Sequence, residues 1–214
     1  MKFVGGRLCL DFINTVEGRV SRPGRKRSRD YADNVLTDKI AGYADLVGWG
    51  RLAGVAGDQE ARLLLRRAAG HPGNAAETLA RAIALREALY RIFKAAIERW
   101  HPEDADMNTL RRELTVARAH EHFLHSSGAF AWAWDEQPLA LDYLLWPICR
   151  SAADLLASSS DLSRVRQCGG EKCGWIFLDT SRNRSRHWCD MRDCGNRTKV
   201  RRFRQRRERP AKET

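Results

Sequence analysis

The chain lacks the features that would mark a membrane protein or a familiar enzyme. In its 214 residues, no apolar run approaches the roughly eighteen residues that a membrane helix needs. It also contains no glycine-rich phosphate loop, no nucleophile-elbow pattern and no convincing pair of carboxylates. These absences favour a protein that is not an enzyme and that makes no contact with a membrane.

Cysteine is scarce too, yet four of the six cysteines fall within 27 residues, from Cys168 to Cys194. The N-terminal stretch "MKFVGGRLCLDFINTV" is interrupted by Arg7 and Asp11, so it does not have the form of a secretion signal, and we expect a cytoplasmic protein. Thiols stay reduced in the cytoplasm, which favours a metal site over disulfides for a tight group of cysteines. The separate Cys9 and Cys149 are expected to be small core residues.

The formal charge of +11 is concentrated near the C-terminus. From Arg164 onward there are 16 Lys or Arg against 6 Asp or Glu, whereas residues 1–163 hold 22 against 21. A neutral body with a strongly basic tail indicates an attached nucleic-acid-binding module. A second basic segment, "RVSRPGRKRSR" (Arg19–Arg29), is either a solvated loop or a second phosphate contact.

The hydrophobic spacing predicts an α+β fold of two parts. A mostly helical N-terminal domain with a small antiparallel β-hairpin occupies residues 1–160, and a treble-clef-like zinc finger occupies 161–214, with the boundary in "ASSSDLS". The stretch Leu8–Phe12 suits either a strand or the start of a helix. Helices are expected over Tyr43–Gly54, from a capping box of Asn74 and Glu77 to His101, over Met107–Ala117, and over Asp142–Ala157 with Pro147 in its first turn or at a kink.

A hairpin is predicted on either side of the turn at Ser126–Gly128. Strand alternation places Phe130, Trp132 and Trp134 on one face, where we expect core packing, with a small-molecule pocket as the alternative. The nearby His120, His122 and His125 are expected to be exposed polar residues rather than a second metal site.

The four clustered cysteines form two matched pairs. Cys168 and Cys173 enclose four residues, as do Cys189 and Cys194, and fifteen residues separate the pairs. This spacing suits a tetrahedral zinc ion held by four thiolates, which leaves no open position and therefore indicates a structural site. "WIFLD" reads as a strand after the first pair, and Cys194 is expected to open a helix. His187 could compete as a ligand, but we expect it at the surface.

The C-terminal segment resembles the CGNR zinc-finger family through Cys194–Arg197 and the surrounding "FLDTSRNRSRHWCDMRDCGNRTKVRRFRQR". Near the N-terminus, "LCLDFINT" and "YADLVGWGRLAG" resemble the ABATE domain that usually precedes this finger. The resemblance implies a stress-induced transcription regulator with DNA binding by the finger and sensing by the larger domain. His187 stands where arginine is expected, which implies a weaker phosphate contact.

The helix expected after Cys194 carries Arg197, Arg201 and Arg204 on one face, and we expect Val200 and Phe203 to pack on the zinc module. Asn196 could cap the helix or read a base. The candidate nucleic-acid contacts are Arg184, Arg186, Asn196, Arg197, Lys199, Arg201 and Arg204. The sequence thus predicts a zinc-containing, DNA-binding transcription regulator, with a small-molecule effector and a homodimer as further expected partners. The alternatives are an RNA- or ribosome-associated protein with the same module, and an enzyme tethered by its finger.

Overall fold

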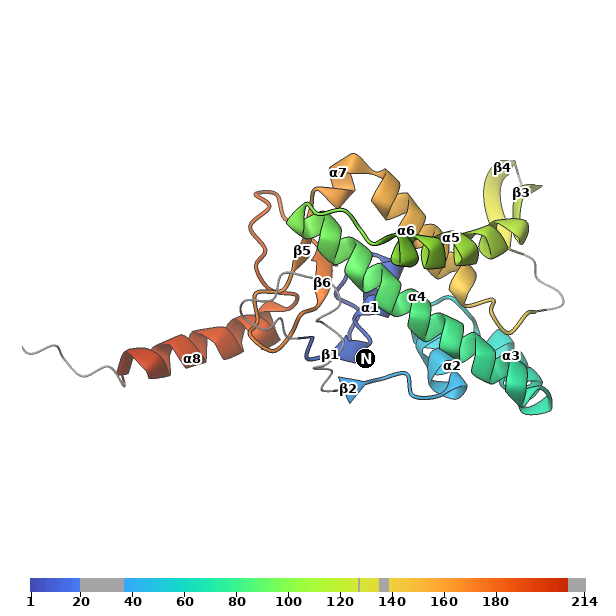
Figure 1. Cartoon of the computed structure of the whole chain (residues 1–214), viewed down its shortest axis with the longest axis horizontal. Helices are drawn as coiled ribbons and strands as arrows, with labels where there is room; N and C mark the ends of the chain where they lie inside the picture. Colours follow the sequence, from blue (N-terminus) through green and yellow to red (C-terminus); the bar gives the residue numbers. More distant parts are fainter. Residues whose placement is uncertain (20–36, 127, 135–138, 208–214) are drawn as a thin grey trace, which may run out of the picture.

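The computed structural model describes residues 1–19, 37–126, 128–134 and 139–207. Two helices organise its body: α1 (Leu8–Ile13) lies at the centre, and the long α4 (Pro72–Glu98) runs along the helical body (Figure 1). Cys9, Leu10 and Phe12 of α1 are almost fully buried, and Cys149 is buried as well. The two lone cysteines are therefore core residues, as expected.

The remaining helices of the body pack around this pair. At one end lie α2 (Tyr43–Leu52) and α3 (Asp58–Gly70), while α5 (Asp104–Ala119) and α6 (Leu145–Ala157) pack on each other and on the central helices. The short α7 (Ser159–Leu162) leads from α6 toward the C-terminal segment. Within the described ranges, no helix is long and apolar enough to cross a membrane.

The strands form three separate antiparallel pairs in the described part of the chain. The pairs are β1 (Val16–Glu17) with β2 (Thr37–Asp38), β3 (Glu121–Ser126) with β4 (Ala129–Trp134), and β5 (Val165–Gln167) with β6 (Ile176–Leu178). The expected α+β class, mostly helical with a small hairpin, is confirmed.

Most of the expected elements are present, with differences at their ends. Pro147 lies in the first turn of α6, as predicted. The capping box at Asn74 is wrong, because α4 begins at Pro72 directly after His71 and Asn74 lies inside the helix. Proline suits a first helical position, where its missing N–H would have no partner in any case. Helix α3 was not predicted at all.

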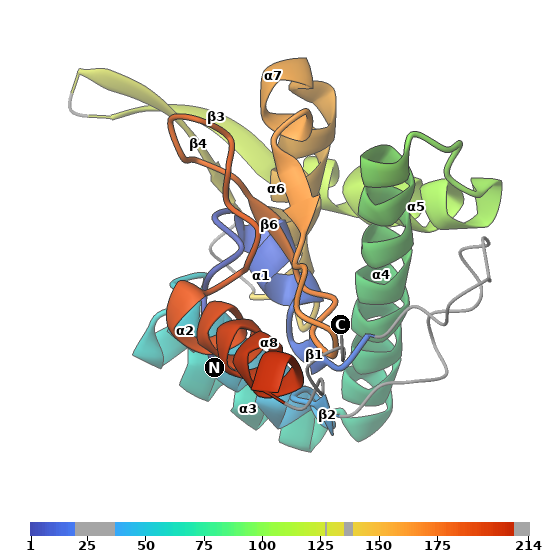
Figure 2. The ribbon, with the colours of Figure 1, turned by 90° about the vertical axis from the view of Figure 1, so that its left-hand side faces the viewer.

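The core expectation for the hairpin is wrong. Phe130 and Trp132 are exposed, and only Trp134 is half-buried, against Trp146. The hairpin stands away from the other described elements (Figure 2), and the outer rings of its aromatic face are exposed. His122 and His125 are exposed as expected, but His120 lies before β3 and stacks on Trp146 with ring centroids 3.9 Å apart.

The C-terminal segment shares the hydrophobic core of the body. Val165, Ile176 and Leu178 belong to the same buried cluster as α1 and α4. The Asn14 amide bonds to both backbone groups of Ile176: its Nδ2 donates to the carbonyl at 2.8 Å and its Oδ1 accepts from the N–H at 2.9 Å. The division near residue 160 therefore stays a prediction, since packing is continuous across it.

Candidate metal centre and nucleic-acid interface

The four clustered cysteines converge from three segments of the chain. Cys168 and Cys173 lie in the loop between β5 and β6, Cys189 lies in the following loop, and Cys194 lies in a π-helical turn, Met191–Gly195. All four sulfur atoms lie within 4.8 Å of one another. Three of these cysteines are buried and Cys173 is half-buried.

The distances between the sulfurs fit a zinc ion. Cys189 Sγ lies 3.6 Å from Cys173 Sγ and 3.7 Å from Cys194 Sγ. A tetrahedral site with Zn–S bonds of about 2.3 Å has sulfur–sulfur edges of about 3.8 Å. Backbone N–H groups of Cys189 and Gly170 point at Cys168 Sγ, at 3.3 and 3.5 Å, which stabilises a thiolate there. Four thiolates of this geometry suit zinc, the metal of a zinc finger.

The thiols also influence one another electrostatically. Hydrogen bonds from the Cys173 and Cys189 thiols lower the pKa of Cys168. Hydrogen bonds with Cys168 and Cys173, burial and negative charge on those two sulfurs raise the pKa of Cys189. Four thiols this close therefore resist losing all their protons without a cation, and a bound zinc ion would compensate the charge.

Gly170 and His187 lie close to the cysteine cluster. A Cβ on Gly170 would lie 3.2 Å from both Cys173 Cβ and Cys194 Sγ, so the tight turn at this position leaves little room for a side chain. His187 is exposed and is absent from the group of four, and its backbone carbonyl accepts a hydrogen bond from Gly169 at 2.9 Å.

The loop between β6 and Cys189 is held by a buried carboxylate. Asp179 is fully buried and accepts hydrogen bonds from the backbone N–H and hydroxyl of Ser181 and from the backbone N–H of Arg186. Burial raises the pKa of Asp179, but these hydrogen bonds outweigh it and the pKa is lowered. The sequence analysis missed this residue, although an aspartate two positions before a serine is a common turn signal.

Arg186 was predicted to contact nucleic acid, but its side chain is bonded within the protein. Its guanidinium donates to the carbonyls of Val4, Trp188 and Cys189 and lies over the Phe177 ring, 4.3 Å from the centroid. These contacts tie the zinc loops to the N-terminus. Arg184, by contrast, is exposed in the same loop, with a positive φ of 51°.

Helix α8 (Asn196–Arg207) begins at the metal centre and projects away from the body (Figure 1). It carries seven Lys or Arg and no Asp or Glu. Thr198 is buried and donates to the Cys194 carbonyl at 2.8 Å, which fixes the first turn to the zinc loops. Asn196 is exposed, and its amide donates to the Arg192 carbonyl, so it stabilises the preceding turn.

Two of the predicted contact residues have acidic partners nearby. Arg197 pairs with Asp193 at 2.7 Å, and Arg201 pairs with Glu171. Lys199 and Arg204 are exposed, and neither forms an ion pair with a described residue. Five of the seven candidate contact residues therefore lie on one helix, whose first half is braced by carboxylates.

The expected packing of Val200 and Phe203 on the zinc module is wrong. Both are exposed, at 50% and 60%. The interior of the zinc module is already filled by Trp175, Phe177 and the cysteines. Val200 and Phe203 therefore lie exposed on the same helix as the arginines.

Lys2 contributes to the site without any signal in the sequence. Its ammonium pairs with Asp190 at 3.3 Å and with Asp193 at 3.0 Å, and so joins the N-terminus to the turn that carries Cys194. Of the basic segment Arg19–Arg29, only Arg19 is described: it is buried and pairs with Glu87 at 2.6 Å. Residues 20–29 lie outside the described residues.

Comparison with known proteins matches both parts of the chain. A family model described as "putative stress-induced transcription regulator", ABATE, matches residues 6–159, and the CGNR zinc finger matches residues 164–207. Both are regulatory or zinc-finger types rather than enzyme families. A search of curated proteins found no match. With well over half of its length matched, the chain belongs to the ABATE family of transcription regulators and carries a CGNR zinc finger.

Proposed function

We propose that this regulator binds duplex DNA through α8, presented by a structural zinc centre. The observation that carries the proposal is the helix itself, which is strongly basic, is attached to the zinc module through its first turns and projects away from the body. Like charges so close together repel one another on an isolated helix, and phosphates would neutralise them.

The zinc ion would be held by Cys168, Cys173, Cys189 and Cys194. It would cross-link the zinc loops, and four thiolate ligands would leave it no open coordination position. The chain's own residues then orient the helix. Thr198 ties the first turn to Cys194, and the Arg197–Asp193 and Arg201–Glu171 pairs set the direction in which α8 leaves the module.

The dimensions of α8 suit the major groove of B-DNA. Twelve residues span about 18 Å, and the groove is about 12 Å wide, enough for one helix. Arginine can bond to guanine through two donors, and apolar side chains such as Val200 and Phe203 can contact thymine methyl groups. Lys199 and Arg204 would meet phosphate or bases first, because carboxylates hold Arg197 and Arg201.

RNA is the second candidate partner. The major groove of an A-form duplex is deep and narrow, so side chains on a projecting helix reach little of it. The shape of α8 therefore favours DNA. Mobility-shift competition tests this: duplex DNA of random sequence should displace a bound DNA probe at lower concentration than duplex or single-stranded RNA. Displacement by RNA at lower concentration would support the RNA-associated function instead.

A small-molecule effector would bind between the β3–β4 hairpin and α6, where a cavity of about 520 Å³ is lined by Trp132, Trp134 and Leu155. Arg7 and Arg150 also line the cavity. Each is paired with a carboxylate, Arg7 with Asp161 and Arg150 with Asp154, so the charges of the lining favour neither an anionic nor a cationic ligand. The effector therefore stays a prediction.

A further inference from the structure

The β3–β4 hairpin exposes more apolar surface than any other element of the described chain. Phe123, Leu124, Phe130 and Trp132 are exposed at 59%, 49%, 68% and 57%. Exposed apolar groups gathered on one element mark an interaction surface, because a soluble monomer gains nothing from leaving them in water.

The exposed rings lie on one face of the hairpin. In the observed register Phe123 faces Trp132 and His125 faces Phe130, so alternate residues bring these side chains together. Phe123 stacks on Phe130 with centroids 5.5 Å apart, and lies 5.0 Å from Trp132. Along residues 121–134 the only charged residue is Glu121, which pairs with Arg150. The outer part of the face thus consists of aromatic rings and the imidazole of His125, with no Lys, Arg, Asp or Glu.

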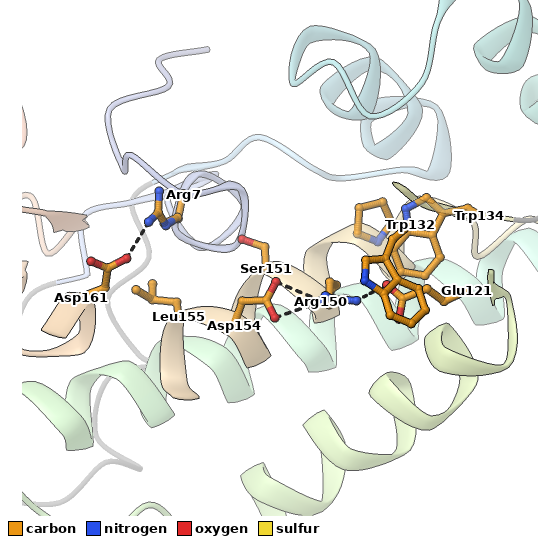
Figure 3. A pocket seen from close by; sticks show the side chains of 10 residues that line it. Arg7, Glu121, Trp132, Trp134, Arg150, Ser151, Asp154, Leu155 and Asp161 are labelled. Carbon is orange, nitrogen blue, oxygen red and sulfur yellow. Dashed lines mark hydrogen bonds and ion pairs between the residues drawn. The ribbon is translucent and has the colours of Figure 1, made fainter. Parts of the chain in front are cut away.

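The cavity described above begins where this aromatic face meets the body. Figure 3 shows Trp132, Trp134 and Glu121 at one end of it and the Arg7–Asp161 ion pair at the other, with Ser151, Asp154 and Leu155 of α6 between them. One continuous surface therefore carries protruding rings at the hairpin tip and a hollow at the hairpin base.

We propose that this surface binds a second copy of the chain across a two-fold axis. A surface with a protrusion at one end and a hollow at the other is complementary to itself when rotated by half a turn, which is the requirement for a symmetric dimer. Phe130 and Trp134 lie four residues apart on β4, about 14 Å along the strand. An axis near Trp132 would place Phe130 of each copy at the cavity of the other.

The available area suits a dimer. With about 200 Å² for each aromatic side chain, the exposed fractions of Phe123, Phe130 and Trp132 amount to roughly 400 Å² per copy, or roughly 800 Å² per dimer. A specific interface buries about 1,200–2,000 Å² in total, so three rings per copy already supply about half of a typical one. The hairpin backbone and the cavity rim would add the rest.

Charge does not oppose this arrangement. The basic helix α8 lies at the opposite end of the molecule from the hairpin, so two copies joined at their hairpins keep their positive ends apart (Figure 1). The dimer does not depend on the proposed function, but it would leave both copies of α8 free.

Sedimentation equilibrium of the zinc-loaded full chain tests the inference. We expect a dimer with a dissociation constant in the micromolar range or tighter. Phe130→Ala should raise that constant by at least about a hundredfold, because each dimer loses two buried rings. Asp154→Trp, which fills the cavity from its exposed rim and leaves the hairpin sequence unchanged, should weaken the dimer as well.

Leu52→Ala provides the matched control, because Leu52 is equally exposed but lies on α2. It should leave the dissociation constant unchanged, and circular dichroism should show all variants folded. A wild-type chain that remains monomeric overturns the inference, whether or not a small molecule is found in the cavity. A dimer unaffected by Phe130→Ala also overturns it, because the interface must then lie elsewhere.

Discussion

Gly174→Ala should separate the zinc loops from the body, because the backbone of Gly174 packs directly against Arg19. Its φ is +71°, a conformation that L residues rarely adopt, and a Cβ there would lie 2.2 Å from the Arg19 carbonyl oxygen. The obstacle is backbone, so no side-chain rotation can relieve it. The β5–β6 loop must therefore move away from residues 14–19.

The loss can be divided into two contributions. Alanine in the left-handed region costs roughly 1–2 kcal/mol. Moving the loop also breaks up to three buried hydrogen bonds: Trp175 Nε1 to the Val16 carbonyl at 2.8 Å, and the two between Asn14 and Ile176. At about 1 kcal/mol for each bond, the total loss is roughly 3–5 kcal/mol.

Gly54→Ala isolates the conformational part of this loss. Gly54 has almost the same φ, +73°, but no atom lies within 4 Å of the position its Cβ would take. We therefore expect Gly54→Ala to lower the free energy of unfolding by only about 1–2 kcal/mol. Urea unfolding of the zinc-loaded full chain measures both variants. If the two lose the same stability, the loop is not held against Arg19 and the described contact is wrong.

Three other perturbations have defined outcomes. Purified protein should contain about one zinc per chain, and the Cys189→Ser variant should lose this zinc. The variant should also lower the melting temperature of the whole chain, because β6 belongs to the common core. Elemental analysis measures the zinc and calorimetry the melting temperature; an unchanged zinc content would contradict the assignment. Lys2→Ala should leave the free energy of unfolding almost unchanged, because its ion pairs are solvent-exposed, and a clear loss of stability in urea unfolding would contradict this. Burial raises the pKa of Glu87, but the hydrogen bonds and charge of Arg19 outweigh burial, so the pKa is lowered. The ionised carboxylate therefore stabilises the fold above its unfolded pKa of about 4.3. This stabilisation is lost as the pH falls through the folded pKa. Glu87→Gln should therefore destabilise the protein at pH 7, and its difference from wild type in unfolding free energy should shrink below about pH 4; a constant difference would contradict this pairing.

Local patterns in the sequence predicted the metal centre and most helices. The cysteine spacing places the members of each ligand pair within six residues of each other, so the site could be anticipated without knowledge of the rest of the fold. The hairpin was found for the same reason, since its strands are adjacent in the sequence.

Burial could not be predicted in the same way. Alternation along β4 shows that Phe130 and Trp132 share a face, but not whether another element covers it. The spacing of Val200 and Phe203 likewise shows that they share a face of the helix, but not whether another element covers that face. The contacts between Asn14 and Ile176 join residues 162 positions apart, and no periodicity reports them. Contacts of this range decide that β5 and β6, which carry the first zinc loop, belong to the common core.

The salt dependence of DNA binding tests the central claim most directly. If α8 neutralises about five phosphates, log K should fall with log salt with a slope near −4 to −5. Replacing Lys199 and Arg204 by alanine should reduce the slope by up to about two, because each lost phosphate contact removes about one. Replacing the exposed Arg62 and Arg66 of α3, a helix at the far end of the body from α8 (Figure 1), removes the same charge and should leave the slope almost unchanged. Equal slopes for the wild type and the α8 variant would contradict the account, because the phosphates would then be bound by another surface.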